Sequence, residues 1–204
     1  MNVIILSGFL GSGKTTFLAQ LIAYLSALSQ EGHTGVAVIE NEIGKFNIDG
    51  DTLGAQGIEV REILSGCACC TVAGDLVAGV ESIKEQLNPR WLLVEASGMG
   101  IGSDVAKVLL ENCTFVSNTL TLVLVDAKRF GTFVKVIEPL ITSQLKDIDL
   151  ILLNKVDLVS QEELAKTREL VKRYNDAVEI VEIAAIEPLG DTLLERMAGG
   201  RNGQ

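Results

Sequence analysis

Long apolar runs, long polar tracts and an excess of positive charge are all missing from this sequence. The first apolar run, residues 2–6, is too short to cross a bilayer, so we expect no transmembrane helix. With no polar tracts and 48% hydrophobic residues, the chain is expected to fold over nearly its whole length. A net charge of −10 argues against nucleic acid and anionic membranes as the main partners. What remains is a folded chain of 204 residues, a length that suits one domain with a sizeable core.

Cysteines are few and poorly spaced for disulfides. The sequence has four, and three of them are crowded into Cys67, Cys69 and Cys70. Neighbouring cysteines do not easily form an unstrained bridge, whereas a reducing compartment keeps them as thiols or metal ligands. Cys113 stands alone and is assigned to the core. No basic segment or cleavage site precedes the first apolar run, so we expect no signal peptide and a cytoplasmic protein.

Short apolar runs alternate with segments of helical period. Such runs are typical of parallel strands that are covered on both faces. Ser160 with Glu163 predicts a capping box, which opens a helix through Tyr174. We therefore expect an α/β fold with a doubly wound, mainly parallel sheet and helices on both faces. The domain is expected over 1–198, followed by a flexible tail at 199–204. The predicted strands are 3–6, 36–39, 91–94, 120–125 and 150–153, with helix candidates at 18–28 and 71–87.

The segment from Gly8 to Thr15 matches the pattern G-x-x-x-x-G-K-S/T of a phosphate-binding loop. Its glycines let successive backbone N–H groups point at phosphate oxygens, and the following helix adds a favourable dipole. Lys14 would place its charge on the β- and γ-phosphates, and the Thr15 hydroxyl would ligate Mg²⁺. The nucleotide-binding residues predicted here are Gly8, Gly11, Ser12, Gly13, Lys14, Thr15 and Thr16.

A second motif, Asn154-Lys155-Val156-Asp157, directly follows the strand predicted at 150–153. Asp157 could accept hydrogen bonds from guanine N1–H and its exocyclic amine together, whereas adenine has no donors in that arrangement. Asn154 would contact the imidazole edge of the base, and the stem of Lys155 would cover its face. The backbone of Ala185 could close the pocket. By itself the motif could be a turn, but together with a phosphate loop it favours GTP over ATP.

Three carboxylates follow predicted strands where a nucleotide-bound Mg²⁺ would lie. Glu40 and Glu42 come after the strand at 36–39, and Glu95 ends the strand at 91–94. Ligands of parallel sheets bind outside the carboxyl ends of the strands. Glu95 would act on metal or water and Gly98 N–H on the γ-phosphate, with the alternative that Glu95 is a surface carboxylate. The predicted catalytic residues are Lys14, Glu95 and Glu42, and the predicted Mg²⁺-linked residues are Thr15, Glu40 and Glu95.

The three crowded cysteines also predict a metal site. Thiolates are suited to Zn²⁺ or a similar thiophilic ion such as Co²⁺, but Cys67, Cys69 and Cys70 are one short of a tetrahedral set. The fourth ligand would be a carboxylate, a water or a group from another chain. That chain could be a second copy, which would give a homodimer, or a client. The alternative is that these small residues pack the start of the helix at 71–87.

Together these motifs resemble the CobW/HypB/UreG family of metal-chaperone GTPases, and its CobW-type branch in particular. The resemblance covers a GTPase domain only, and CobW-type members usually add a second domain and often a histidine-rich stretch. Lys45 departs from the family pattern, as do Gly100 and Gly102, where a proline is usual. The glycines at 98, 100 and 102 predict a mobile loop. The matching segments are 8–16, 40–49, 66–70, 95–98 and 154–157.

The resemblance implies Mg²⁺-dependent GTP hydrolysis, metal binding at the cysteines, and delivery of a metal or metallocofactor to a client metalloprotein. Three functions stay open. The protein could be a metallochaperone, a nucleotide-driven activator of a corrinoid (cobalamin) or other metalloenzyme, or a metal- or redox-sensing switch without metal transfer. Because no glutamine or arginine finger can be assigned, we expect slow intrinsic hydrolysis.

Overall fold

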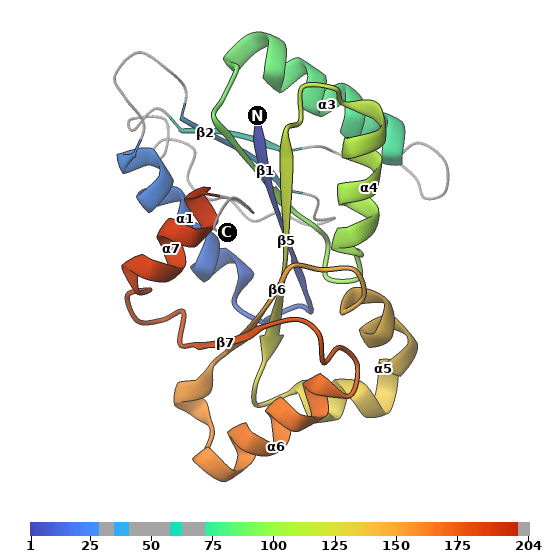
Figure 1. Cartoon of the computed structure of the whole chain (residues 1–204), viewed down its shortest axis with the longest axis vertical. Helices are drawn as coiled ribbons and strands as arrows, with labels where there is room; N and C mark the ends of the chain where they lie inside the picture. The colour runs from blue at the N-terminus through green and yellow to red at the C-terminus, as the bar shows by residue number, and fades with distance from the viewer. Residues whose placement is uncertain (29–34, 41–57, 63–71, 200–204) are drawn as a thin grey trace.

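The sheet of this protein has seven strands, all paired in parallel, in the order β3-β2-β4-β1-β5-β6-β7 (Figure 1). The computed structural model describes residues 1–28, 35–40, 58–62 and 72–199. The strands are β1 (Asn2–Gly8), β2 (Val36–Glu40), β3 (Ile58–Glu62), β4 (Trp91–Glu95), β5 (Asn118–Asp126), β6 (Leu150–Asn154) and β7 (Ile180–Ile183). All five strands predicted from apolar runs are confirmed, each extended by one to three residues.

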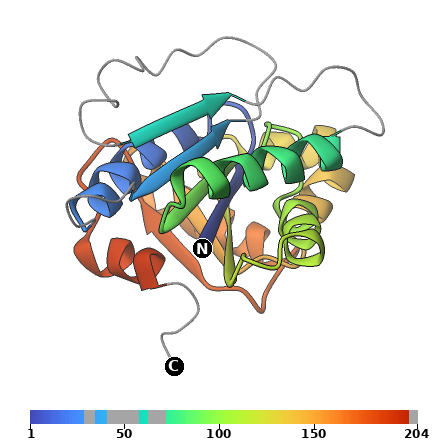
Figure 2. The same ribbon diagram turned by 90° about the horizontal axis from the view of Figure 1, so that it is seen from above.

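Helices cover both faces of this sheet, as expected for a doubly wound fold (Figures 1 and 2). The helices are α1 (Lys14–Ala27), α3 (Val72–Leu87), α4 (Gly102–Asn112), α5 (Phe130–Gln144), α6 (Gln161–Lys172) and α7 (Asp191–Gly199), with a short 3₁₀ helix, η1, at Val156–Leu158. Helices α1 and α7 pack on one face, and the other four pack on the opposite face. In the described part of the chain, no helix is long and apolar enough to span a membrane.

Alternation of side chains along each buried strand divides the core into two layers. In β1, Ile4 and Leu6 face α1 and α7, while Val3 and Ile5 face α3 and α4. Each of these four side chains is at most 2% exposed. Strands that are buried on both faces read as continuous apolar runs, which is why the sequence predicted them well.

Local sequence signals placed some helices and missed others. The capping box at Ser160 and Glu163 is confirmed, since each residue's side chain bonds the other's backbone N–H. Helices α4, α5 and α7 had no sequence prediction. Gly102, which was expected in a mobile loop, is instead the first residue of α4, packed beside Thr121 and Ser7. Gly199, assigned to the tail, is the last residue of α7, and 200–204 lie outside the described residues.

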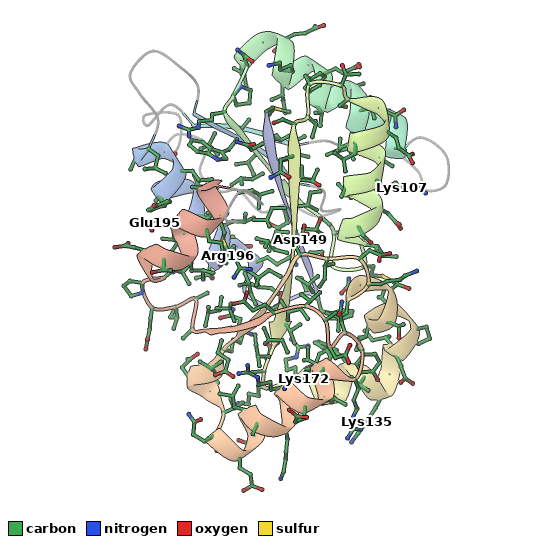
Figure 3. The ribbon with its side chains drawn as sticks, viewed as in Figure 1. Lys107, Lys135, Asp149, Lys172, Glu195 and Arg196 are labelled. Carbon is green, nitrogen blue, oxygen red and sulfur yellow. The ribbon has the colours of Figure 1, made fainter. Side chains whose placement is uncertain are left out.

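The order of the strands reverses direction at β1, between β4 and β5. From β1 the chain crosses to β2 and β3 on one side, returns to β4, and then continues on the other side of β1 with β5. Such a switch in direction leaves the strand ends open for a ligand. Figure 3 shows Lys107 on α4 and Arg196 on α7, on opposite sides of the sheet.

Candidate nucleotide site

The loop between β1 and α1 has the backbone that a phosphate site needs. Gly8, Gly11 and Gly13 all have positive φ angles, of 136°, 76° and 102°. A side chain at Gly8 would collide with the carbonyl oxygen of Leu124, and one at Gly13 with the amide of Asn154. Only glycine fits these positions, because the loop curls tightly against β5 and β6.

Lys14 and Ser12 lie inside this curled loop. Lys14 is 5% exposed, and its Nζ donates to the carbonyl oxygen of Gly8 at 3.1 Å and lies 3.7 Å from Glu95 Oε1. The Ser12 hydroxyl is buried and has no hydrogen-bond partner among the residues that the structure describes. A positive charge and an unpaired hydroxyl beside a helix N-terminus fit the oxygens of a nucleotide phosphate.

Thr15 and Thr16 lie in the first turn of α1 and are exposed. This turn has no acidic side chain, and the residue before it, Gly13, makes no side-chain cap. The first N–H groups of α1 therefore keep their capacity to donate to an anion. The position of Thr15 next to Lys14 is compatible with its predicted role as a Mg²⁺ ligand.

Asn154 braces the phosphate loop from the end of β6. Its Nδ2 donates to the carbonyl oxygen of Ser12 at 2.7 Å, and its Oδ1 accepts from Ala185 N–H at 2.8 Å. With 2% exposure, Asn154 joins the phosphate side of the site to the predicted base side. The expected contact with the imidazole edge of a base would have to use the second amide hydrogen. This bracing role was not predicted.

Lys155 pairs with Asp126, a residue that the sequence analysis missed. Lys155 Nζ lies 2.8 Å from Asp126 Oδ2 and also donates to the carbonyl oxygen of Gly11. The other carboxylate oxygen of Asp126 accepts from the backbone N–H groups of Lys128 (2.9 Å) and Arg129 (3.1 Å). Asp126 ends β5, directly after an apolar run, so the rule that singled out Glu95 could also have found it.

Asp157 lies on η1 and, unlike Asn154 and Lys155 of the same motif, it is exposed. Within the described residues its carboxylate makes no hydrogen bond or salt bridge. The nearby loop at 184–189 is held by Gln20 of α1. Gln20 Nε2 donates to the carbonyl oxygens of Ala185 (2.7 Å) and Glu187 (2.9 Å), and its Oε1 accepts from Leu189 N–H (2.9 Å). The predicted base side thus includes an exposed carboxylate, Asp157, and a loop that Gln20 fixes.

The contacts of Asp126 predict a stability effect for Asp126→Ala. The substitution removes the carboxylate beside Lys155 Nζ and the acceptor of Lys128 N–H, while Arg129 N–H keeps only the backbone carbonyl of residue 126 (3.2 Å). We therefore expect the free energy of unfolding to fall by about 3 kcal/mol. Urea denaturation of the nucleotide-free protein would measure this loss. Asp176→Ala is the matched control, because Asp176 is exposed and its loss should cost under about 0.5 kcal/mol. Equal stability of the two variants would contradict the assigned role of Asp126.

On the phosphate side, Glu95 and Gly98 approach the same loop. Glu95 is 6% exposed and faces Lys14, which excludes the alternative of a free surface carboxylate. An added side chain at Gly98 would come within 3.3 Å of Leu10 N, so this backbone lies directly against the phosphate loop. Both residues therefore adjoin the phosphate loop, Glu95 through Lys14 and Gly98 through Leu10.

The predicted metal residues are only partly covered by the described structure. Glu42, Cys67, Cys69 and Cys70 lie outside the described residues. Glu40 ends β2, in register with Glu95 on β4 and with Glu62 on β3, a third glutamate that the sequence analysis did not single out. In the described ranges no group of three His, Cys, Asp or Glu residues could hold a metal.

The predicted core position of Cys113 is confirmed. It is 1% exposed beside α3 and α4, and burial raises the pKa of its thiol above the ordinary value. A thiol of this kind is inert packing rather than a ligand.

Comparison with known proteins places this chain in a family. Residues 2–182 match the model of the family described as CobW/HypB/UreG, nucleotide-binding domain. The chain is 31% identical over 217 residues to the zinc chaperone CobW of Pseudomonas aeruginosa, covering 89% of this chain and 56% of that protein. It is 29% identical over 191 residues to the zinc-regulated GTPase metalloprotein activator 1 of Schizosaccharomyces pombe, covering 88% of this chain and 45% of that one.

Solved structures agree on the fold. The hydrogenase maturation factor HypB of Archaeoglobus fulgidus superposes with a TM-score of 0.68 at 19% identity, over 98% of this chain and 89% of that one. This chain spans about half the length of the curated relatives that it matches. The predicted parallel α/β fold and the predicted family are confirmed, and the chain belongs to the CobW/HypB/UreG family through its nucleotide-binding domain.

Proposed function

We propose that this chain is a Mg²⁺-dependent GTP hydrolase whose nucleotide cycle controls the handling of a thiophilic metal. The observation that carries the proposal is the meeting of three groups at one edge of the sheet. They are the buried Lys14–Glu95 pair at 3.7 Å, the unpaired Ser12 hydroxyl and the available Asp157 carboxylate. The name of the S. pombe relative includes the word GTPase, which supports GTP hydrolysis as the reaction.

In this proposal each residue does a defined part of the chemistry. Lys14 moves its charge from Gly8 and Glu95 to the β- and γ-phosphates and stabilises the charge that develops on them. Asp157 selects guanine, while Gly8, Gly11, Gly13 and Thr16 bind the phosphates through the backbone around Ser12. Glu95 and Glu42 orient the attacking water, and Gly98 N–H contacts the γ-phosphate. Bound Mg²⁺, held by Thr15 and acidic residues such as Glu40 or Glu95, would supply further neutralisation of phosphate charge.

The metal in this proposal is Zn²⁺, with Co²⁺ as a chemical analogue, bound by Cys67, Cys69 and Cys70. The names of the relatives, zinc chaperone and zinc-regulated GTPase metalloprotein activator, support zinc rather than a corrinoid. Three thiolates leave one tetrahedral position for a water, a client metalloprotein or a second copy of the chain. Thiolates of this kind persist in a reducing compartment, so we place the protein in the cytoplasm. The nucleotide-binding domain extends to Gly199, the last residue of α7.

The proposal predicts that metal affinity depends on the bound nucleotide. Titration of Zn²⁺ or Co²⁺ into the GDP and GTP-analogue forms, followed by thiolate-to-metal absorption for Co²⁺, should give different dissociation constants. Coupling is reciprocal, so the metal must change the ratio of GTP affinity to GDP affinity by the same factor. Cys69→Ser and Cys70→Ser should weaken binding strongly, since each removes one of three thiolates.

Cys113→Ala is the control for this titration, because its thiol is buried in the core and should not contribute. Equal metal affinities in both nucleotide forms would leave a structural metal site and overturn the coupling. A second candidate function is activation of a metalloenzyme without metal transfer, and the name of the S. pombe relative supports its first part, activation of a metalloprotein. It would be recognised by an active client whose metal did not come from this protein.

A further inference from the structure

Gln144, the last residue of α5, is a buried glutamine whose side chain serves the loop after β4. It is 1% exposed, and its Nε2 donates to the carbonyl oxygens of Gly98 (3.2 Å) and Gly100 (3.1 Å). These two acceptors fix the orientation of the amide, because a flipped amide would bring three oxygens together. Its Oε1 has no partner in the described ranges of the chain. A buried amide with one unpaired atom costs stability, so packing alone does not account for it.

The loop that Gln144 holds lies directly against the phosphate loop. After β4 it is attached to the sheet by Ala96 N–H, which donates to the carbonyl oxygen of Leu6 at 2.9 Å. The loop then forms a turn, in which Gly100 N–H donates to the carbonyl oxygen of Ser97 at 2.7 Å. Gly98 lies against Leu10, and among the described residues its N–H has no backbone hydrogen bond. With both carbonyls bound to Gln144, the N–H of Gly98 is a donor that the loop can offer to an anion beside Leu10.

Helix α5 contacts both loops of the phosphate site. At its N-cap, Arg129 Nη1 lies 3.4 Å from the carbonyl oxygen of Leu10, and at its last residue Gln144 reaches Gly98 and Gly100. Between these contacts the helix bends at Ile137, which has non-helical φ and ψ angles of −137° and 37° two residues before Pro139. A proline inside a helix removes a backbone hydrogen bond and causes such a bend. One helix therefore places the two loops relative to each other.

We propose that Gln144 is a positioning residue for the γ-phosphate, which it sets through the loop at 97–100. By binding the carbonyl oxygens of Gly98 and Gly100, its amide turns them away from the phosphate side and leaves Gly98 N–H to donate to a γ-phosphate oxygen. A carbonyl released from Gln144 would instead bring a negative dipole towards the phosphates. This inference rests on the proposed GTP hydrolysis and deepens it by assigning the sensing of the third phosphate to α5.

The test compares GTP-analogue and GDP affinities in Gln144→Met. Methionine keeps the length and volume of the side chain but donates no hydrogen bond, so the loop loses both contacts. We expect binding of a non-hydrolysable GTP analogue to weaken by about tenfold to a hundredfold, with GDP affinity unchanged. Calorimetric titration of the full chain in the presence of Mg²⁺ measures both constants, and thermal unfolding of the nucleotide-free variant verifies that it folds.

A second variant, Gln144→Glu, adds a pH profile that a structural role would not produce. An ionised carboxyl group accepts but does not donate, so it repels the two carbonyl oxygens, whereas its protonated form can donate one hydrogen bond. Affinity for the GTP analogue should therefore recover in part as the pH falls, and Gln144→Met should show no such recovery.

Gln20→Met is the matched control, because Gln20 is also a glutamine that holds a loop, but on the base side. Its loss should weaken GDP and the GTP analogue by the same factor. Equal weakening of both nucleotides by Gln144→Met, or no weakening at all, would overturn the positioning role. If the unaltered protein binds GDP and the GTP analogue equally and hydrolyses neither GTP nor ATP, it is the proposed function itself that fails.

Discussion

Replacing Lys14 by alanine should lower kcat/KM for GTP hydrolysis by about a hundredfold to a thousandfold, the size of effect seen when one group that stabilises transition-state charge is removed. Lys14 is already positioned inside the phosphate loop, with its Nζ 3.1 Å from the carbonyl oxygen of Gly8. Initial rates of phosphate release over a range of GTP concentrations would measure the loss of kcat/KM. Nucleotide affinity should fall as well, because the lysine charge is also felt by the β-phosphate of the ground state.

Two controls separate this effect from a general loss of structure. Lys107→Ala removes an exposed lysine on α4 and should leave kcat/KM unchanged (Figure 3). Thermal unfolding of nucleotide-free Lys14→Ala reports how much stability is lost when the cation beside Glu95 is removed. A Lys14→Ala variant that folds and keeps more than about a tenth of the original kcat/KM would contradict the assignment of Lys14.

For the base site, Asp157→Asn should weaken GTP binding by about a hundredfold and remove most of the preference for GTP over ATP. An aspartate accepts from two guanine donors at once, and each hydrogen bond to a charged group contributes about 1.5–3 kcal/mol. Asparagine replaces one acceptor by a donor, which then faces a guanine N–H. Competition of GTP and ATP against a fluorescent nucleotide would measure both affinities.

Xanthosine triphosphate provides the rescue for this variant. Xanthine has a carbonyl oxygen where guanine has its exocyclic amine, so the new amide can donate to it and the lost pairing is restored. We therefore expect Asp157→Asn to bind xanthosine triphosphate more tightly than the unaltered protein does. Equal turnover of GTP and ATP by the unaltered protein would instead show that Asp157 does not read the base.

The parts of this protein that the sequence predicted are those encoded by neighbouring residues. The phosphate loop was found because its glycines, Lys14 and Thr15 follow one another between a strand and a helix. The apolar strands were found because burial on both faces excludes polar residues from them. The α6 capping box was found because Ser160 and Glu163 are three residues apart and satisfy each other's backbone.

The helices that were missed lack such local signals. Helix α5 contains Gly131 and Pro139, and both residue types disfavour a helix. The helix bends at Ile137, two residues before the proline. Gly102 was expected to loosen a loop, yet it begins α4, where close packing against Thr121 and Ser7 requires a residue without a side chain. In both cases tertiary packing overrides the local preference of the residue.

Sequence alone thus determined the fold class, the phosphate loop and the base motif. Each is recognised from residues that are close together in the chain, either apolar runs or short motifs. The tertiary structure decided how these parts are held: Asn154 joins the phosphate loop to Ala185, Asp126 binds Lys155, and Gln20 and Gln144 each fix a loop. These braces connect residues that lie 29 to 169 positions apart. Their side chains carry no periodic pattern, and only the folded backbone brings each one within hydrogen-bond distance of its partner.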